Sequence, residues 1–380
     1  MASRQSDGEA VIMQHRSRHT LRQPCVLLLI SLLVLLSRVA AATVEDNDIV
    51  RTGNMDDFTF VSAHHPEDLI QIPQSHWLVA SSMSVDRGKG SPGGGLYLVS
   101  LRNRAAVTVD KGKLLRGTPS QEFSNCPGPP PDNLFAAHGL AIQRMNGQPA
   151  RLLVVNHGGR QSIEVFDISM IGEIPRLHWI GCVVFPNRLS LNAVAPIRHG
   201  GFLVTIMLDF DDSARWQKMQ AGENTGVVYR WTPGHKPVPL PGSEACGNNG
   251  IEVSSDGSIY VAAWGGKAIL RLRERGGRFE REIAPVDFYP DNLRWSPNGR
   301  LLIAGQRRDL KEFLNGCGAS PCRVAWNVAE LDPLKMKITT LLESDGLSFS
   351  DATTVLRIGK ELWLGSATED RIAITRISTK

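Results

Sequence analysis

The sequence has few aromatic residues and almost no basic excess after its first 42 residues. Aromatic residues make up only 6% of the 380 residues, and charged residues make up 21%. Residues 1–42 hold five arginines and two acidic residues, which leaves 37 basic against 36 acidic residues in the rest of the chain. A nucleic-acid-binding protein is expected to keep a basic face. The near balance after residue 42 therefore excludes nucleic acid as the expected partner.

No hydrophobic run has the length of a typical membrane-spanning helix. The run at residues 25–36 has about twelve residues against the roughly twenty that a span needs, and Arg38 interrupts its extension. Arginines precede this run and small residues follow it at 40–42, as in a signal peptide. We expect residues 1–42 to be a signal peptide, with Met1 or Met13 as the start, and the protein to be secreted or periplasmic. An uncleaved leader that anchors the chain to a membrane is the alternative.

Cysteines are too few for a disulfide framework in a chain of this length. Five follow the leader, namely Cys126, Cys182, Cys246, Cys317 and Cys322. An odd number cannot be fully paired within one chain. The last two flank a short loop that a disulfide could close in an oxidising compartment. No second pair of Cys or His lies nearby at zinc-ligand spacing, so this pattern favours a local disulfide over zinc.

Helical periodicity is nearly absent after residue 45, and common catalytic motifs are missing. The chain contains no Gly-x-Ser-x-Gly, no Gly-x-x-x-x-Gly-Lys and no His-Glu-x-x-His. Short apolar runs alternate instead with turns, as at residues 96–99, 152–155 and 301–304. The pattern indicates a chain of short β-strands.

One unit recurs six times: a polar anchor, an alternating strand, a turn with Gly or Asn, and an apolar strand. The clearest copies begin at Asn249 and Asp291, with hairpin turns at 256–257 and 298–299. Each copy has room for about four short strands. We therefore predict an all-β fold, a six-bladed β-propeller with a central metal channel, as a single domain over residues 60–380 after an N-terminal segment at 43–59. A pair of β-sandwiches is the alternative.

The anchors of such a propeller would converge on its axis, because the first strand of each blade lines the channel. They are Glu67, His138, Asn192, Asn249, Asp291 with Asn292, and Asp351. Ca²⁺ takes about six to eight oxygen ligands, which include carboxylates and amide carbonyls. The pattern therefore predicts a metal site whose ligands are Glu67, Asn192, Asn249, Asp291 and Asn292. Without a cation the two carboxylates would repel each other and favour proton uptake. Separate turn or cap residues are the alternative explanation.

Two histidines lie beside this predicted site. His138 is itself an anchor, and His157 follows the strand at 152–156, one strand further out in the same blade. Such a pair can act as a proton relay in which the outer ring orients the inner one. We predict His138 and His157 as the catalytic pair, with two structural histidines as the alternative.

The same residues carry a resemblance to a known family. The matching stretches, in the family's order, are His-Pro-Glu-Asp-Leu (65–69), His-Gly-Leu-Ala-Ile (138–142), Leu-Leu-Val-Val-Asn-His (152–157), Ser-Ile-Glu-Val-Phe (162–166), Leu-Asn (191–192), Asn-Gly-Ile (249–251), Asp-Asn-Leu (291–293) and Leu-Trp-Leu-Gly-Ser (362–366). The chain thereby resembles the paraoxonase/arylesterase family, within the wider gluconolactonase–regucalcin group of six-bladed propellers. The resemblance extends over residues 60–378.

This resemblance implies an enzyme, a carboxylic ester hydrolase that acts on small-molecule lactones or aryl esters. It implies one catalytic calcium on the five predicted ligands and a histidine dyad at His138 and His157. The calcium would polarise the carbonyl and the dyad would activate water.

Two features depart from the family's pattern. Family members commonly hold a second, structural calcium between the Asp after the Glu and an Asp after the first Asn ligand. Asp68 fills the first position, but Ala193 fills the second and has no ligand oxygen, which weakens the case for a second metal at Asp68. The chain also has no cysteines that would join its ends, so we expect strand pairing alone to close the ring.

Two other functions stay open at this point. One is a non-catalytic propeller that binds a ligand or partner around a structural calcium. The other is a metal-independent enzyme similar to strictosidine synthase. The physiological substrate and the oligomeric state are not indicated, and a membrane is a partner only if the leader is retained.

Overall fold

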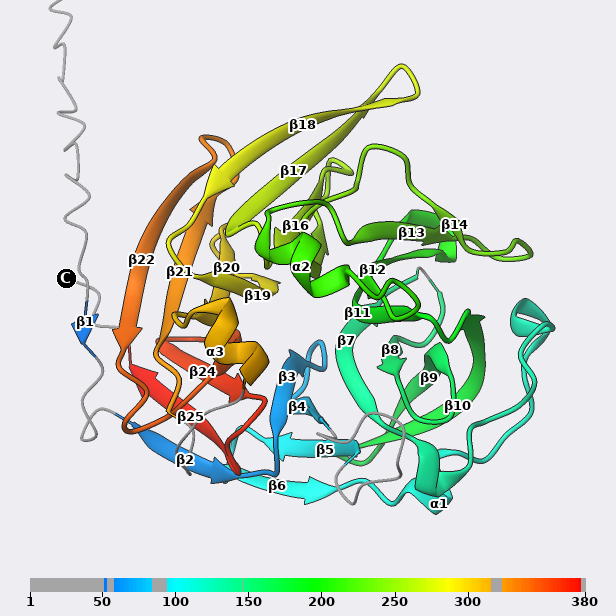
Figure 1. The fold of residues 1–380 in the computed structure, drawn as a ribbon. Coiled ribbons are helices and arrows are strands. Elements are labelled where there is room, and N and C mark those ends of the chain that lie inside the picture. The colour runs from blue at the N-terminus through cyan, green and yellow to red at the C-terminus, as the bar shows by residue number, and fades with distance from the viewer. Residues whose placement is uncertain (1–50, 53–57, 84–93, 146, 316–322, 377–380) are drawn as a thin grey trace, which may run out of the picture. The chain divides into compact units, whose positions relative to one another are not determined.

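Six β-sheets form a six-bladed β-propeller, which confirms the predicted all-β fold (Figure 1). The computed structural model describes residues 51–52, 58–83, 94–145, 147–315 and 323–376. By internal contacts the chain divides into Met1–Asp46 and Asn47–Lys380, and every described residue belongs to the second unit. The expected leader therefore lies outside the described residues, as do Cys317 and Cys322.

The first three blades follow one another along the chain. Blade 1 consists of β3 (Pro66–Gln71), β4 (Trp77–Ser82), β5 (Gly95–Ser100) and β6 (Ala105–Thr108). Blade 2 consists of β7 (Ala137–Gln143), β8 (Arg151–Asn156), β9 (Gln161–Ile171) and β10 (Ile174–Phe185). Blade 3 consists of β11 (Leu189–Pro196), β12 (Phe202–Asp209), β13 (Val227–Trp231) and β14 (Val238–Pro239).

The last three blades complete the ring. Blade 4 consists of β15 (Asn248–Val253), β16 (Ile259–Ala263), β17 (Ala268–Arg275) and β18 (Arg278–Pro285). Blade 5 consists of β19 (Tyr289–Trp295), β20 (Leu301–Gln306), β21 (Trp326–Asp332) and β22 (Lys337–Ser344), with β1 (Arg51–Thr52) as a fifth, parallel strand. Blade 6 consists of β23 (Ala352–Ile358), β24 (Glu361–Ser366), β25 (Arg371–Arg376) and β2 (Thr59–Ser62).

Strand pairing closes the ring, as expected. The N-terminal strand β2 is the outer edge of blade 6 and runs antiparallel to the last strand, β25, with Ser62 opposite Arg371. The strand β2 and the C-terminal strand β25 therefore share one sheet. The strand β2 begins at Thr59, one residue before the expected start of the propeller, and residues 51–52 of the expected N-terminal segment pair with blade 5.

The apolar runs at residues 152–155 and 301–304 are the second strands of their blades, and the run at 96–99 lies in a third strand, β5. Residues 152–155 in β8 and 301–304 in β20 are fully buried. Neighbouring blades cover both faces of these strands, so a continuous apolar run replaces the alternation of a half-exposed strand. The cores between blades are built on these runs.

Five of the six inner strands have a β-bulge where the repeat has its anchor. The register with the second strand shifts across residues 67–68 in β3, 138–139 in β7, 192–193 in β11, 249–250 in β15 and 291–292 in β19. Bulges redirect side chains and are common beside functional sites. In blade 6 the shift falls on Thr353, so Asp351, the anchor that the repeat assigns there, lies two residues out of register.

Glycines after two anchors let the inner strands approach each other. A Cβ on Gly139 would lie 2.4 Å from the carbonyl oxygen of Asn192, and one on Gly250 would lie 2.3 Å from that of Asp291. Only glycine fits so close to a neighbouring backbone. The His-Gly and Asn-Gly motifs therefore bring the anchors of adjacent blades together.

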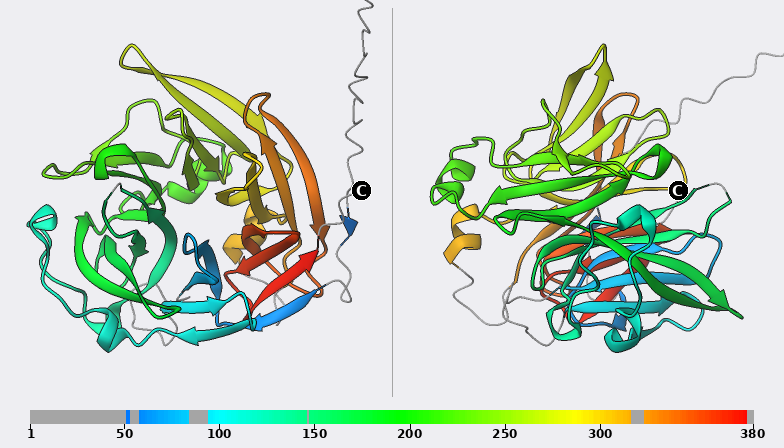
Figure 2. Two further views of the ribbon diagram at one scale, coloured as in Figure 1. Left: turned by 180° about the vertical axis from the view of Figure 1, so that it is seen from behind. Right: turned by 90° about the vertical axis from the view of Figure 1, so that its right-hand side faces the viewer.

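Two short helices lie on the same face of the propeller, α2 (Arg215–Gln220) and α3 (Leu310–Asn315) (Figure 2). A third short helix, α1 (Lys111–Leu114), lies in the β6–β7 connection. The 3₁₀ turns are η2 (Gln121–Phe123), η3 (Asp132–Leu134) and η4 (Arg198–Gly200). Among the described residues, no helix is long and apolar enough to cross a membrane.

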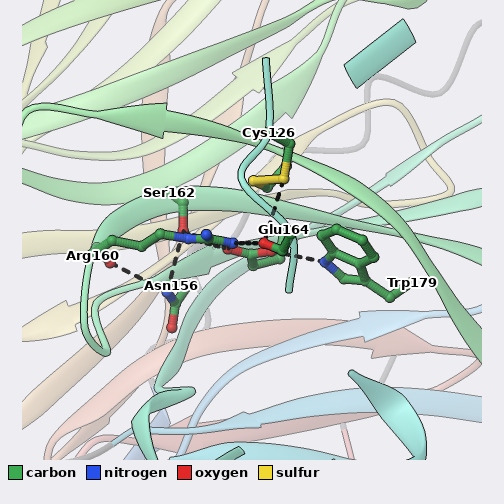
Figure 3. The surroundings of a disulfide bond; sticks show 8 residues. Cys126, Asn156, Arg160, Ser162, Glu164 and Trp179 are labelled. Atoms are coloured by element: carbon green, nitrogen blue, oxygen red, sulfur yellow. Dashed lines mark hydrogen bonds and ion pairs between the residues drawn. A yellow bond between two sulfur atoms is a disulfide. The ribbon is translucent and has the colours of Figure 1, made fainter. Parts of the chain in front are cut away.

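A disulfide joins Cys126, in the β6–β7 connection, to Cys182 in β10 (Figure 3). Beside it the buried Glu164 accepts hydrogen bonds from Trp179 Nε1 at 2.8 Å and from Arg160 Nη2 at 2.8 Å. The disulfide and a hydrogen bond of 2.8 Å from Arg160 Nη2 to the carbonyl oxygen of Gly128 tie the connection to blade 2. The sequence predicted a disulfide only for Cys317–Cys322, because spacing along the chain does not reveal partners that are 56 residues apart.

Candidate functional site

The bulges open into a pocket of about 290 Å³ on the axis of the propeller. Its polar lining consists of Glu67, His138, Asn192, Asn249, Asp291, Gln306, Asp351 and Thr353. Four of the five predicted metal ligands therefore line one pocket together with the predicted inner histidine. We call Glu67, Asn192, Asn249 and Asp291 the pocket cluster.

The fifth predicted ligand, Asn292, lies beside the pocket cluster and does not line the pocket. Its Nδ2 donates a hydrogen bond of 2.8 Å to Glu67 Oε1. Rotation of the Asn292 side-chain amide by a half-turn would direct Oδ1, in place of Nδ2, towards the pocket cluster. The five side chains come together from the inner strands of four blades, because Asp291 and Asn292 both come from β19.

The donor set of the pocket cluster fits a hard cation. Asn192 Oδ1 and Asn249 Oδ1 are buried and have no hydrogen-bond partner among the described residues. A buried acceptor without a partner costs about 1–3 kcal/mol. Burial and the neighbouring Glu67 carboxylate raise the pKa of Asp291 well above its usual value. A cation with oxygen ligands would satisfy both amide oxygens and balance both carboxylates.

The two predicted histidines are in direct contact. His138 Nδ1 lies 2.8 Å from His157 Nε2, and His157 Nδ1 lies 2.9 Å from Gln161 Oε1. The Gln161 carbonyl oxygen is an acceptor, so it selects the His157 tautomer with hydrogen on Nδ1. His157 Nε2 then accepts from His138 Nδ1, which places the basic nitrogen of His138 at Nε2. That atom lies 3.4 Å from Glu67 Oε2.

Hydrogen bonds fix the turn that carries His157. Asn156 Oδ1 accepts from the backbone N–H of Ala136 at 2.9 Å and from that of Gly158 at 3.1 Å. Asn156 Nδ2 donates to Ser162, which in turn donates to Glu164 (Figure 3). The network beside the disulfide therefore extends to the outer histidine.

The remaining walls of the pocket are apolar. They are formed by Met83, Met207, Leu208, Phe210, Trp216, Trp264, Phe313 and Ala367. Trp216 comes from α2 and Phe313 from α3, and their ring centroids are 6.1 Å apart. The helices thus add an aromatic rim to a polar floor, which suits a ligand with an apolar body and a polar reacting group.

A second buried cluster on the inner strands contains its own cation. Arg294 Nη2 donates to Asp68 Oδ2 at 2.5 Å and to the carbonyl oxygen of Leu140 at 2.9 Å, and its Nη1 lies 3.5 Å from Glu252 Oε1. We call Asp68, Glu252 and Arg294 the arginine cluster. Burial raises the pKa of Glu252 to about 7, although Arg294 acts in the opposite direction.

Asp68, the possible ligand of a second metal, has all of its oxygens in use within the arginine cluster. Besides Arg294, it accepts from Thr354 Oγ1 at 3.0 Å and from the backbone N–H groups of Leu69 and Leu140. A cation at Asp68 would have to displace the guanidinium. Ala193 adds no ligand, as its sequence position indicates.

Solved structures share this architecture. One, named as a candidate gluconolactonase, has a TM-score of 0.50 at 14% identity and covers 87% of this chain and 94% of that one. A luciferin-regenerating enzyme has a TM-score of 0.51 at 14% identity and covers 84% of this chain and 94% of that one. A calcium-binding protein, regucalcin from Agrobacterium tumefaciens, has a TM-score of 0.46 at 13% identity and covers 84% of this chain and 95% of that one.

The fold is that of gluconolactonase-type propellers. At these identities the likeness establishes the fold alone. No protein-family model and no curated protein sequence matches the chain.

Four polar residues in or beside the site were not predicted from the sequence: Gln161, Arg294, Gln306 and Thr353. Gln306 donates from Nε2 to Asp291 Oδ2 at 2.8 Å, and its Oε1 accepts from Trp264 at 3.0 Å. Gln161 orients His157, and nothing in its sequence position marks it. The position of Arg294 could have been inferred from the sequence. It closely follows the Asp-Asn anchor, on a strand that the repeat places at the axis.

Proposed function

We propose that the protein is a calcium-dependent hydrolase of lactones or aryl esters, of the paraoxonase/arylesterase type. The observation that carries this proposal is the pocket cluster, with two partnerless amide oxygens and two carboxylates in the same pocket as His138. A water nucleophile needs a base and an electrophile close together. Solved structures with this fold include one named for gluconolactone hydrolysis, so lactones are the first substrates to test.

Glu67, Asn192, Asn249, Asp291 and Asn292 would hold the calcium ion. When bound, the ion would polarise the ester carbonyl and stabilise the developing oxyanion. Gln306 donates to Asp291, which holds that carboxylate in place on β19.

The histidines would move the proton. His138 Nε2 faces the pocket and would accept a proton from the attacking water. His157 Nε2 would stabilise the charged His138 ring through its Nδ1–H, and Gln161 would hold His157 in the required tautomer. Here His138 is the catalytic residue, while His157 and Gln161 are positioning residues.

The aromatic rim would bind the apolar part of the substrate. Trp216, Trp264 and Phe313 would cover it and exclude water from the reacting group.

The first experiment measures hydrolysis of γ- and δ-lactones and of phenyl acetate before and after calcium is removed with a chelator and restored. We expect activity to disappear and return. Calcium binding without turnover of any substrate would favour the non-catalytic propeller, and turnover that persists in chelator would favour the metal-independent enzyme.

The His138→Gln variant separates catalysis from metal binding. We expect kcat to fall by about 10²–10⁴-fold, since general-base catalysis contributes an effect of that size. The matched control, His235→Gln, changes an exposed loop histidine and should keep full activity. Calcium titration of both variants shows whether the metal site survives. Unchanged kcat in His138→Gln would rule out the proposed base.

We also propose that the chain is exported to an oxidising compartment, as its N-terminal leader suggests. The Cys126–Cys182 disulfide supports this, because disulfides persist mainly outside the cytosol. N-terminal sequencing of the protein recovered from its native host tests it. A new N-terminus close to residue 42 is expected, whereas an intact leader would indicate a membrane anchor.

A further inference from the structure

Two histidines and an aspartate meet at the seam where the ring closes. His64 and His65 lie just after β2, and Asp370 lies just before β25. Their potential ligand atoms all lie within 4.8 Å of one another. His64 and Asp370 are 306 residues apart in the sequence, so only the pairing of β2 with β25 brings them together. We call these three residues the seam cluster.

The backbone holds the seam cluster in place. The N–H of Ala63 donates to the carbonyl oxygen of Asp370 at 3.1 Å, and that of His65 donates to Glu369 at 2.9 Å. His65 has a φ of 45°, which is uncommon for a residue other than glycine. Consecutive side chains of a strand point to opposite faces. Here the turn at His65 instead stacks the two imidazole rings, with centroids 3.9 Å apart.

Hydrogen bonding orients the rings for ligation. His65 Nδ1 lies 3.3 Å from the carbonyl oxygen of Met83. A donated Nδ1–H leaves Nε2 as the ligand atom, which is the usual arrangement behind a metal-bound histidine. His64 Nδ1 is in contact with Asp370 Oδ1, so a nitrogen and a carboxylate oxygen already face each other.

We propose that the seam cluster binds a transition-metal ion such as Zn²⁺, which fastens the two ends of the propeller together. Two imidazole nitrogens and one carboxylate suit zinc, copper or nickel, whereas calcium prefers oxygen ligands alone. Metal–ligand bonds of about 2.0–2.2 Å require the ligand atoms to be about 3.4 Å apart. Asp370 and His64 are 76% and 43% exposed, so their side chains have room for this small adjustment.

The test uses the full chain without a histidine tag, with calcium present in excess to fill the pocket cluster. Zinc binding is measured by calorimetry and by metal analysis after dialysis, and Tm is measured with and without zinc. We expect one zinc ion per chain and a higher Tm, because a ligand that binds only the folded state stabilises it. Absence of zinc binding would overturn the proposal and leave an ordinary surface ion pair between His64 and Asp370.

Two variants locate the bound zinc. His64→Asn and Asp370→Asn should each lower zinc affinity by at least about tenfold and abolish the rise in Tm. Both change exposed or half-exposed side chains, and circular dichroism checks their folding. The control His235→Asn should bind zinc like the parent chain. His138→Gln should also keep this site, and loss of zinc there but not in Asp370→Asn would place the ion in the pocket and refute the proposal.

Discussion

The pocket cluster and the arginine cluster differ in how the charges of their carboxylates are balanced. Both bring two buried carboxylates together on the inner strands. In the arginine cluster the chain supplies its own cation, Arg294, and the Asp68 oxygens are all bonded. In the pocket cluster, the described residues that line the pocket include no Lys or Arg, the pKa of Asp291 is raised, and two amide oxygens lack partners among those residues.

The difference indicates which of the two clusters serves function. Buried carboxylates need a partner charge, and an internal guanidinium fills that need permanently. A pocket whose described lining contains no Lys or Arg suits a cation that can exchange and contact a substrate. The arginine cluster is therefore a fixed joint between blades, while the pocket cluster is suited to chemistry.

Of the changes that test this comparison, removal of the Arg294 guanidinium should have the largest effect. Arg294→Met leaves Asp68 and Glu252 buried without a cation, which should lower the free energy of unfolding by about 3–5 kcal/mol. Urea unfolding measures it. Arg275→Met changes an arginine that is 66% exposed and should stay within about 0.5 kcal/mol of the parent. If Arg294→Met does not fold, Arg294→Lys keeps the charge but loses the forked hydrogen bonds, and a smaller loss is expected. Equal stability of Arg294→Met and Arg275→Met would contradict this role.

Removal of a carboxylate from the pocket cluster should act in the opposite direction. Glu67→Gln should weaken calcium binding on the order of 10²-fold, because ligand charge sets calcium affinity. Without calcium its Tm should equal or exceed that of the parent, since one of two repelling carboxylates is gone. Calorimetry and thermal unfolding measure the two effects, with the exposed Glu223→Gln as control. Unchanged calcium affinity would remove Glu67 from the site.

A methyl group between the inner strands should disturb the frame that carries both clusters. Gly139→Ala places a Cβ 2.4 Å from Asn192 O, and the required shift should cost about 1–3 kcal/mol. In Gly266→Ala the nearest atoms are 3.5 Å away, so this control should be tolerated. Urea unfolding compares them. A fully stable Gly139→Ala would show that the inner strands can separate without loss.

Cys246 is a buried ionisable group outside both clusters. Its burial is expected to have the smallest measurable effect of those discussed, a change in thiol reactivity. Burial raises the pKa of its thiol to about 11. The thiolate is the reactive form, so only about one molecule in a thousand carries it at pH 8. Alkylation followed by mass mapping of the Cys246 peptide should show slow labelling in the native protein and fast labelling in denaturant. Equal rates in both conditions would mean that this thiol is accessible.

Much of the fold follows from local sequence signals. Asp-Gly and Asn-Gly turns separate strands of the right length. The apolar runs at 152–155 and 301–304 mark second strands, because these strands are buried on both faces. Repetition of the anchor predicted six blades and placed Glu67, Asn192, Asn249 and Asp291 in one pocket. Asp351 shows the limit of this reasoning, because the bulge of its blade falls at Thr353 and the anchor is therefore out of register. A repeat pattern in the sequence does not reveal where a bulge falls.

Contacts between distant segments that lie outside the repeat pattern were not predicted. The Cys126–Cys182 disulfide, the support of His157 by Gln161 and the seam cluster all depend on which loops and edges meet. No periodicity encodes such meetings, and each residue type involved has common roles elsewhere.

The sequence by itself determined the strand pattern, the sixfold repeat and the anchors, because turn chemistry and burial act on neighbouring residues. Only the tertiary structure decided how the buried charges are balanced. Arg294 reaches Asp68, which is 226 residues away, and thereby neutralises one cluster, while the residues described around the pocket of the other cluster include no Lys or Arg. Charge balance depends on distances in space, and those are set when the last blade closes on the first.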